Sequence, residues 1–228
     1  MMAMTRHETS YQDAGKLKRH QQELWETNRA TWRITHPFMA DLADGLTLVP
    51  VVDNRLPSAT TDGHSLFFNA SFSVGLNAVT RRFLQAHLVW HCVLGDILPR
   101  QVKDQHRWHL ACDHEVNGLL VHLGISLPYQ AVLFFSQLGQ PAKAVYDWLI
   151  HHPAPQLEQP LDRHPTDTAK LISGLDANHD DAFVPVTPDK ALIHHWQAHA
   201  SFLARDYRGT PSLPAAIDTK MCTLERRC

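Results

Sequence analysis

Apolar residues recur at roughly helical spacing between residues 14 and 34, and charged side chains fill the positions between them. This periodicity predicts an amphipathic helix. The residue before a proline disfavours helical backbone, so Pro37 predicts that the helix ends ahead of it. The apolar anchors are Leu17, Leu24, Trp25, Trp32 and Ile34.

Three short β-prone runs follow this helix. Residues 46–52 form the first run, and residues 58–61 and 65–68 form the second and third. The pair Asp62-Gly63 separates the last two runs. An Asp-Gly pair between two β-prone runs is a strong hairpin signal. The sequence therefore predicts three strands, of which the second and third form a hairpin.

The rest of the chain is dominated by helical periodicity. Helices are predicted over residues 78–98, 104–123, 141–151 and 187–207. Residues 152–186 are rich in Pro, Asp and His without periodicity, which predicts a long loop. The fold class that follows is α+β, with a small β-sheet and its hairpin packed on a helical bundle.

Composition and charge narrow the function classes. Apolar residues make up 44% of the 228 residues, charged residues 19%, and the formal net charge is −2, which is typical of a soluble globular protein. No global charge attracts nucleic acid or an anionic membrane. We expect no signal peptide at residues 1–6, no membrane span, and reduced thiols, because the four cysteines show no C-x-x-C spacing. These features together favour a cytoplasmic protein.

Histidine spacing supplies the candidate chemistry. Among the 17 histidines, His87 and His91 stand at i and i+4 of a predicted helix, within reach of one tetrahedral zinc ion. Such a pair also arises by chance, so a third ligand is required. Asp113 on the next predicted helix is the candidate, and Asn117, four residues later, could orient it.

The order of these segments resembles the metallopeptidase domain at the N-terminus of a bacterial family of von Willebrand A-like proteins. The matching segments are residues 35–38, 59–63, 66–69, 84–95, 108–113, 116–117 and 145–148, with Gly124 and Pro128. Residues 30–150 carry most of the resemblance. It implies a zincin-like fold, which we assign to residues 1–150. From the sequence pattern we expect residues 151–208 to form a loop and a helix packing on that domain, and residues 209–228 to form a flexible tail.

The resemblance also implies a zinc site. The family's H-E-x-x-H ligands correspond to His87 and His91, and its aspartate ligand corresponds to Asp113. Its glutamate has no counterpart, because position 88 is leucine. That glutamate takes a proton from zinc-bound water, and loss of a general base costs about 10²–10⁴ in rate. Asp96 stands where the family tends to place a further histidine, and we interpret it as a capping or surface residue.

Several other residues could take part in the site. Glu115 is a candidate replacement base, but two helical positions turn it away from Asp113. His195 and His199 form a second i, i+4 pair without an acidic neighbour, which favours surface histidines. Asp162, Arg163 and His164, in the long loop, could close over the cleft.

Three functions therefore remain open. The first is a degenerate metallopeptidase homologue that holds zinc and binds a peptide or protein; extended peptides add to the sheet edge beside the zinc helix in zincins, and residues 66–69 are the expected edge. The second is an active zinc hydrolase with an unorthodox base. The third is a metal-free scaffold that partners an ATPase.

Overall fold

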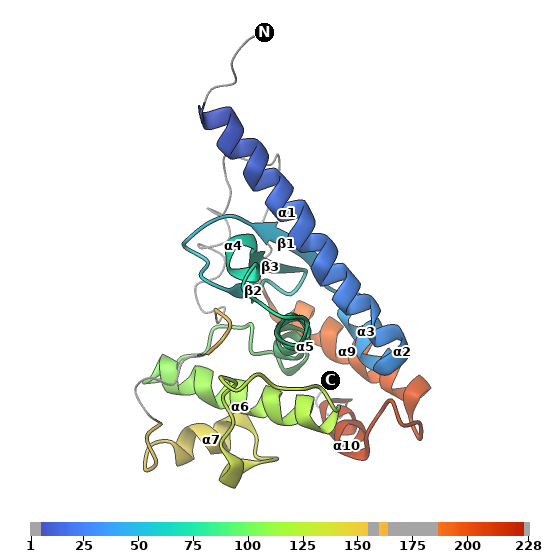
Figure 1. Ribbon diagram of the computed structural model, residues 1–228. Helices are drawn as coiled ribbons and strands as arrows, with labels where there is room; N and C mark the ends of the chain where they lie inside the picture. The colour runs from blue at the N-terminus through green and yellow to red at the C-terminus, as the bar shows by residue number, and fades with distance from the viewer. Residues whose placement is uncertain (1–5, 155–159, 164–186, 226–228) are drawn as a thin grey trace.

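The computed structural model describes residues 6–154, 160–163 and 187–225, and it is mostly helical with a three-stranded sheet. The α+β class predicted from the sequence is confirmed. The long helix α1 (Arg6–Ala30) lies along strand β1 (Thr47–Val51). Below the sheet in Figure 1, α5 (Ala78–Leu94) packs between it and α6 (Gln105–His122). The candidate site lies in this central part of the fold.

The sheet has the order β1-β3-β2. Strand β2 (Ala59–Thr61) pairs antiparallel with β3 (Ser65–Asn69), which confirms the predicted hairpin. Gly63 has a φ of 87°, a left-handed conformation that glycine adopts without steric cost. Strand β1 pairs with β3 in parallel. The expectation that residues 66–69 form a sheet edge is therefore wrong, because β3 is paired on both sides. The outer strands of the sheet are β1 and β2, and β2 contacts α5.

Helix α5 is buried on nearly all sides. The Asn77 side chain caps it by accepting a hydrogen bond from the Thr80 amide, and Gly95 ends it with a φ of 81°. The Asp104 side chain caps α6 in the same way through the Arg107 amide. Helix α5 ends four residues before the predicted limit of 98 because Gly95 caps it, whereas α6 lies within one residue of its predicted limits at both ends.

The first predicted helix is divided in the structure. After α1 come α2 (Trp32–Thr35) and α3 (Pro37–Ala43). The sequence did not predict α3, which begins at Pro37, where the fixed φ of proline suits a first helical turn. Trp25 of α1 stacks on Phe68 of β3, with ring centroids 4.1 Å apart. This contact fixes α1 on the sheet.

The remaining elements complete the bundle. They are α4 (Ala70–Ser73), the 3-10 turn η1 (Phe135–Gln137), α7 (Ala142–Trp148), α9 (Lys190–Tyr207) and α10 (Ala215–Glu225). Helix α7 packs on α6, and α9 packs on α5 and α3. In the part of the chain that is described, no helix is both long and apolar enough to span a bilayer.

The prediction that residues 209–228 form a flexible tail is wrong for residues 215–225. These residues form α10, which packs on α9 and α6. Ile217, Met221 and Leu224 are buried in the main core. Their i, i+4, i+7 spacing places them on one helical face, and burial of that face holds α10 on the bundle.

Candidate metal centre

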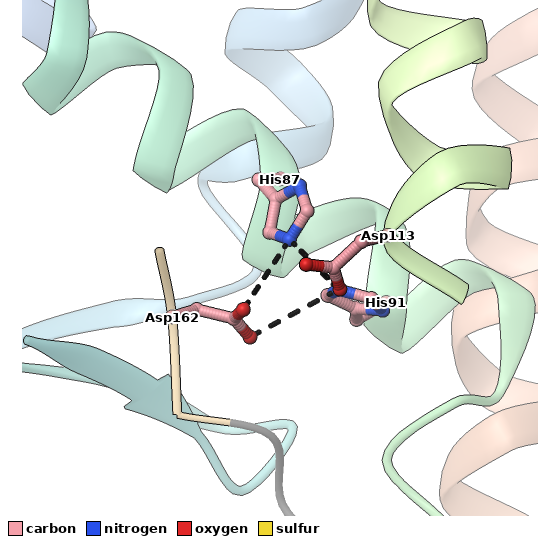
Figure 2. A group of neighbouring side chains, drawn as sticks. All are labelled: His87, His91, Asp113 and Asp162. Carbon is pink, nitrogen blue, oxygen red and sulfur yellow. Dashed lines mark hydrogen bonds and ion pairs between the residues drawn. The ribbon is translucent and has the colours of Figure 1, made fainter. Parts of the chain in front are cut away.

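Four buried side chains converge beside the centre of α5. His87 and His91 come from α5, Asp113 comes from α6, and Asp162 comes from the short described segment 160–163. One ligand atom from each lies within 4.8 Å of every other. Figure 2 shows Asp113 and Asp162 approaching the two histidines from opposite sides. The structure thus brings together the three residues singled out from the sequence and adds a fourth.

The distances within this cluster suit one small cation. The Nε2 atoms of His87 and His91 are 2.9 Å apart. Asp113 Oδ1 lies 3.6 Å from the first and 3.4 Å from the second. Asp162 Oδ1 lies 3.6 Å from His87 Nε2, and Asp162 Oδ2 lies 3.9 Å from His91 Nε2. Ligand atoms at bonds of about 2.0–2.2 Å around a tetrahedral ion lie roughly 3.3–3.6 Å apart.

Asn117 fixes the ring orientation of His87. Its Nδ2 donates to the carbonyl of Val132 at 2.9 Å, so its Oδ1 faces His87 and accepts from Nδ1 at 2.9 Å. The proton of neutral His87 therefore sits on Nδ1, and Nε2 presents a lone pair to the cluster. Asn117, which the sequence predicts to orient Asp113, forms its hydrogen bond with His87 instead.

Asp96 does the same for His91. His91 Nδ1 lies 3.1 Å from Asp96 Oδ2, whose side chain is 10% exposed. The interpretation of Asp96 as a capping or surface residue is therefore incomplete. The backbone of Asp96 does end the helix, because its amide donates to the carbonyl of His91 at 2.9 Å. Its carboxylate turns inward and sets the tautomer of a candidate ligand.

A cation or a proton must lie between the two histidines. Both Nδ1 atoms act as hydrogen-bond donors. If both rings were neutral, their two Nε2 lone pairs would therefore face and repel each other at 2.9 Å. Asp113 Oδ1 and both carboxylate oxygens of Asp162 are buried and have no hydrogen-bond partner among the described residues. A buried carboxylate without a partner is costly, and a metal ion satisfies all of these atoms together. The residues present therefore fit a metal ion.

Electrostatics in the metal-free protein keep a proton in the cluster. Burial lowers the pKa of His91, but contact with the carboxylates of Asp113 and Asp96 outweighs it and raises that pKa to about 10. The pKa of His87 is also raised, against burial and the neighbouring His91, by Asp113 and Asp162. Burial raises the pKa of Asp113, yet the two histidines bring it below its usual range. The cluster therefore holds two carboxylates and at least one protonated imidazole when no metal is bound.

The cluster is closed to solvent. His87, His91 and Asp113 are at most 1% exposed, and Asp162 is 6% exposed. A catalytic zinc site keeps one position for water or substrate, whereas a structural site fills all four with protein ligands. Four protein groups surround the position here, so this arrangement corresponds to the closed type.

Leu88 and Glu115 do not enter the site. Leu88 follows His87 on α5 and is fully buried in the main hydrophobic core. Glu115 accepts a hydrogen bond from the Ala142 amide and pairs with Lys220. It therefore ties α6 to the start of α7 and to α10, which is a structural role rather than that of a base.

The second histidine pair lies elsewhere. His195 and His199 of α9 stack with ring centroids 6.3 Å apart and line a surface pocket with Asp41, Asp44 and Trp196. Neither belongs to the group around His87. The pocket brings acidic residues near them that the sequence analysis did not foresee, because Asp41 and Asp44 are distant in sequence.

Asp162 is the functional candidate whose role sequence reasoning missed. The sequence predicts only that Asp162, with Arg163 and His164, could close over the cleft, and His164 lies outside the described residues. No helical or strand periodicity surrounds it, so spacing offered no link to His87 and His91. The one usable signal was chemical: an acidic side chain in a long loop beside a site that was one ligand short.

Comparison with known proteins agrees with this geometry. A family model described as "Putative metallopeptidase domain" matches residues 20–178, well over half of the chain and all four residues of the cluster. No curated protein and no solved structure shows a significant match.

Proposed function

This chain belongs to that metallopeptidase domain family, and we propose that it is a metallopeptidase-like protein that holds zinc but has lost efficient peptide hydrolysis. Its role is then to bind a peptide or protein. One observation carries the proposal: two histidines of fixed tautomer face each other beside buried carboxylate oxygens that have no hydrogen-bond partner in the described part of the chain. His87, His91, Asp113 and Asp162 would hold the ion.

The donor set supports zinc over other common ions. Two imidazole nitrogens and two carboxylates match the ligands that zinc takes in tetrahedral sites. Calcium and magnesium prefer six or more oxygen ligands, and the cluster offers two nitrogens that those ions bind poorly. Among the described residues no thiol belongs to the cluster, which disfavours a soft-metal or iron–sulfur site.

The loss of hydrolysis follows from the residues around the ion. Zinc, when bound, lowers the pKa of a coordinated water toward about 7 and polarises a carbonyl. The chain places leucine where a glutamate would accept the proton, and Leu88 is packed in the core. Asp113 and Asp162 are the acidic groups of the cluster, and their oxygens already face the two imidazoles. A proton acceptor poised over an open position is therefore lacking among the described residues.

A binding role is supported by the sheet. Strand β2 contacts α5, and one of its sides is covered by no other strand of the described residues. Such an edge offers backbone groups to an extended peptide, and neighbouring pockets select its side chains. We infer that the retained function of this domain is recognition at this edge rather than cleavage.

Metal analysis of protein purified without a histidine tag tests the proposal. We expect about one zinc per chain in the wild type and a large loss in His87→Ala and His91→Ala. His195→Ala is the matched control, since it removes one histidine of an i, i+4 pair outside the cluster. Metal-free wild type, or equal metal content in all variants, would favour the scaffold function instead.

A peptide-library assay, with zinc present and with chelator, tests the loss of hydrolysis. We expect little or no cleavage by the wild type in either condition. Robust cleavage that chelator abolishes would contradict the proposal and leave the active hydrolase with an unorthodox base.

A further inference from the structure

Residues 160–163 lie along the outer side of β2. The backbone amide of Arg163 donates to the carbonyl of Ala59 at 2.7 Å, and the carbonyl of Arg163 accepts from the Thr60 hydroxyl at 2.7 Å. On its other side β2 pairs with β3, so these contacts use the side that the sheet leaves open. The chain thus places its own backbone where an extended peptide would add.

Two side chains of this segment, those of Leu161 and Asp162, point into the domain, whereas Arg163 is exposed. Leu161 packs against the main hydrophobic core. Asp162 is the residue whose carboxylate joins the metal cluster, and its side chain is fully buried. In Figure 2 the segment crosses beside the sheet and carries Asp162 toward His87 and His91. One short stretch therefore engages the strand edge, the core and the cluster together.

We propose that residues 160–163 form an autoinhibitory strap, a ligand that the chain binds to its own peptide edge. The backbone of the strap occupies the outer side of β2, and Asp162 occupies the position on the ion that water or a ligand would take. An external ligand must replace both contacts, so it belongs to the class of extended peptides that carry a carboxylate. The ion in this proposal rests on the proposed function, whereas the backbone pairing does not.

The strap blocks the outer side of β2 effectively because it is tethered, and an external ligand can still displace it because few hydrogen bonds hold it. A tethered segment competes at an effective concentration on the order of millimolar, which excludes weak external peptides. Each of its two hydrogen bonds to β2 favours the closed form by roughly 2- to 10-fold. Loss of one of them should therefore open the edge measurably without unfolding the domain.

Amide hydrogen exchange at Arg163 tests the pairing with β2. In chelated and in zinc-loaded wild type, we expect slow exchange because the amide donates to Ala59. Thr60→Val removes the hydroxyl that holds the Arg163 carbonyl and should speed this exchange about 2- to 10-fold. Thr60→Ser is the matched control, since it keeps the hydroxyl. Unprotected exchange in the wild type, or equal exchange in both variants, would overturn the strap.

Cobalt-substituted protein tests the block at the ion. Acetohydroxamate, a small metal-binding probe, should leave the cobalt spectrum of the wild type unchanged. Arg163→Pro lacks the amide that donates to Ala59 and should let the probe alter the spectrum, whereas Arg163→Ala keeps that amide and should behave as wild type. Thr60→Val should show the same direction of change as Arg163→Pro. Equal response of wild type and both loosened variants would overturn the block.

The ligand class is tested with two blocked peptides. Pro-Leu-Asp-Arg should compete with acetohydroxamate for the Arg163→Pro protein, and Pro-Leu-Asn-Arg, which lacks the carboxylate, should compete at least 10-fold more weakly. Equal competition, or none by either peptide, would overturn the assignment of a carboxylate-bearing peptide.

The two proposals fail in different ways. Protein that takes up no zinc or cobalt contradicts the proposed function, and exchange at Arg163 in that same protein still decides the strap. Protein that takes up metal while Arg163 exchanges as an unprotected amide keeps the metal centre and overturns the strap alone.

Discussion

His91 Nδ1 lies 3.1 Å from Oδ2 of Asp96, so the residue that follows the helix-ending Gly95 also holds a ring that faces the cluster. The helix end and the candidate metal centre are therefore joined through one residue. Partners of this kind set the orientation and basicity of a ligand, and their loss typically weakens metal binding about 10- to 100-fold.

Asp96→Ala should weaken zinc affinity by about that factor, measured by competition with a chromophoric chelator. The backbone amide of Asp96 still donates to His91, so the helix end should persist. Asp96→Asn keeps an oxygen acceptor for His91 and should lose less zinc affinity than Asp96→Ala. Equal affinity of wild type and Asp96→Ala would show that the contact does not act on a metal ligand.

Zinc should stabilise the wild type and not the histidine variants. An ion bound only by the native state adds about 2.7 kcal/mol at 100 times its Kd, which raises the Tm of a domain of this size by roughly 5–10 °C. His87→Ala and His91→Ala should lose most of this zinc-dependent rise, as followed by thermal melting with zinc and with chelator. Equal shifts in both conditions would instead identify the two histidines as core residues without metal.

Zinc binding should release protons near neutral pH. His91 has a pKa raised to about 10, so the metal-free protein carries a proton that zinc must displace. The affinity should therefore rise as the pH is raised toward 10 and fall as the pH is lowered. Titration calorimetry at about pH 7 in buffers of different ionisation enthalpy should show release of about one proton or more. Heats that do not depend on the buffer would contradict this.

Glu115 offers a test of structural against chemical roles. Its carboxylate accepts from the Ala142 amide and pairs with Lys220, and its side chain is 14% exposed. Glu115→Ala should destabilise the fold by about 1.5–3 kcal/mol in denaturant unfolding, since a partly buried charged contact is lost. Zinc content should remain at the wild-type level. If Glu115→Ala lost zinc without losing stability, Glu115 would have to act in the metal centre.

The sequence predicted the helical half of the cluster because its geometry is local. The i, i+4 spacing placed His87 and His91 on one face of α5 whatever the rest of the fold did. The pairing of Asp113 with them needed a resemblance, since the packing of α6 on α5 is not local. Neither helical spacing nor the resemblance linked Asp162 to the cluster. Its position depends on hydrogen bonds between Arg163 and β2, which a sequence pattern does not predict.

The sheet was predicted in part for the same reason. The Asp62-Gly63 turn specifies its hairpin by local chemistry. The parallel pairing of β1 with β3 joins residues that no short turn connects, so the central place of β3 was missed and the edge was assigned to the wrong strand. Helix α10 was missed although Ile217, Met221 and Leu224 carry helical spacing, because its short pattern stands at the end of the chain.

Restoring the missing base should not by itself restore hydrolysis. Leu88 is fully buried in the main hydrophobic core. Leu88→Glu therefore places a carboxylate among apolar side chains and lowers the stability of the fold. Asp162 would also still face both imidazoles and fill the remaining position. We therefore expect Leu88→Glu alone to melt at a lower temperature than wild type and to remain inactive on a peptide library.

Removal of Asp162 should change that result. Leu88→Glu combined with Asp162→Ala leaves two histidines and one aspartate, the three-ligand arrangement of catalytic zinc sites, with a base beside them. This double variant should cleave peptides about 10²–10⁴-fold faster than Leu88→Gln with Asp162→Ala, which has the same shape but cannot accept the proton. Chelator should abolish the difference, and melting curves should establish that both proteins are folded. Equal rates in two folded, zinc-loaded proteins would show that position 88 does not reach the reacting atoms and would contradict the explanation that rests on Leu88.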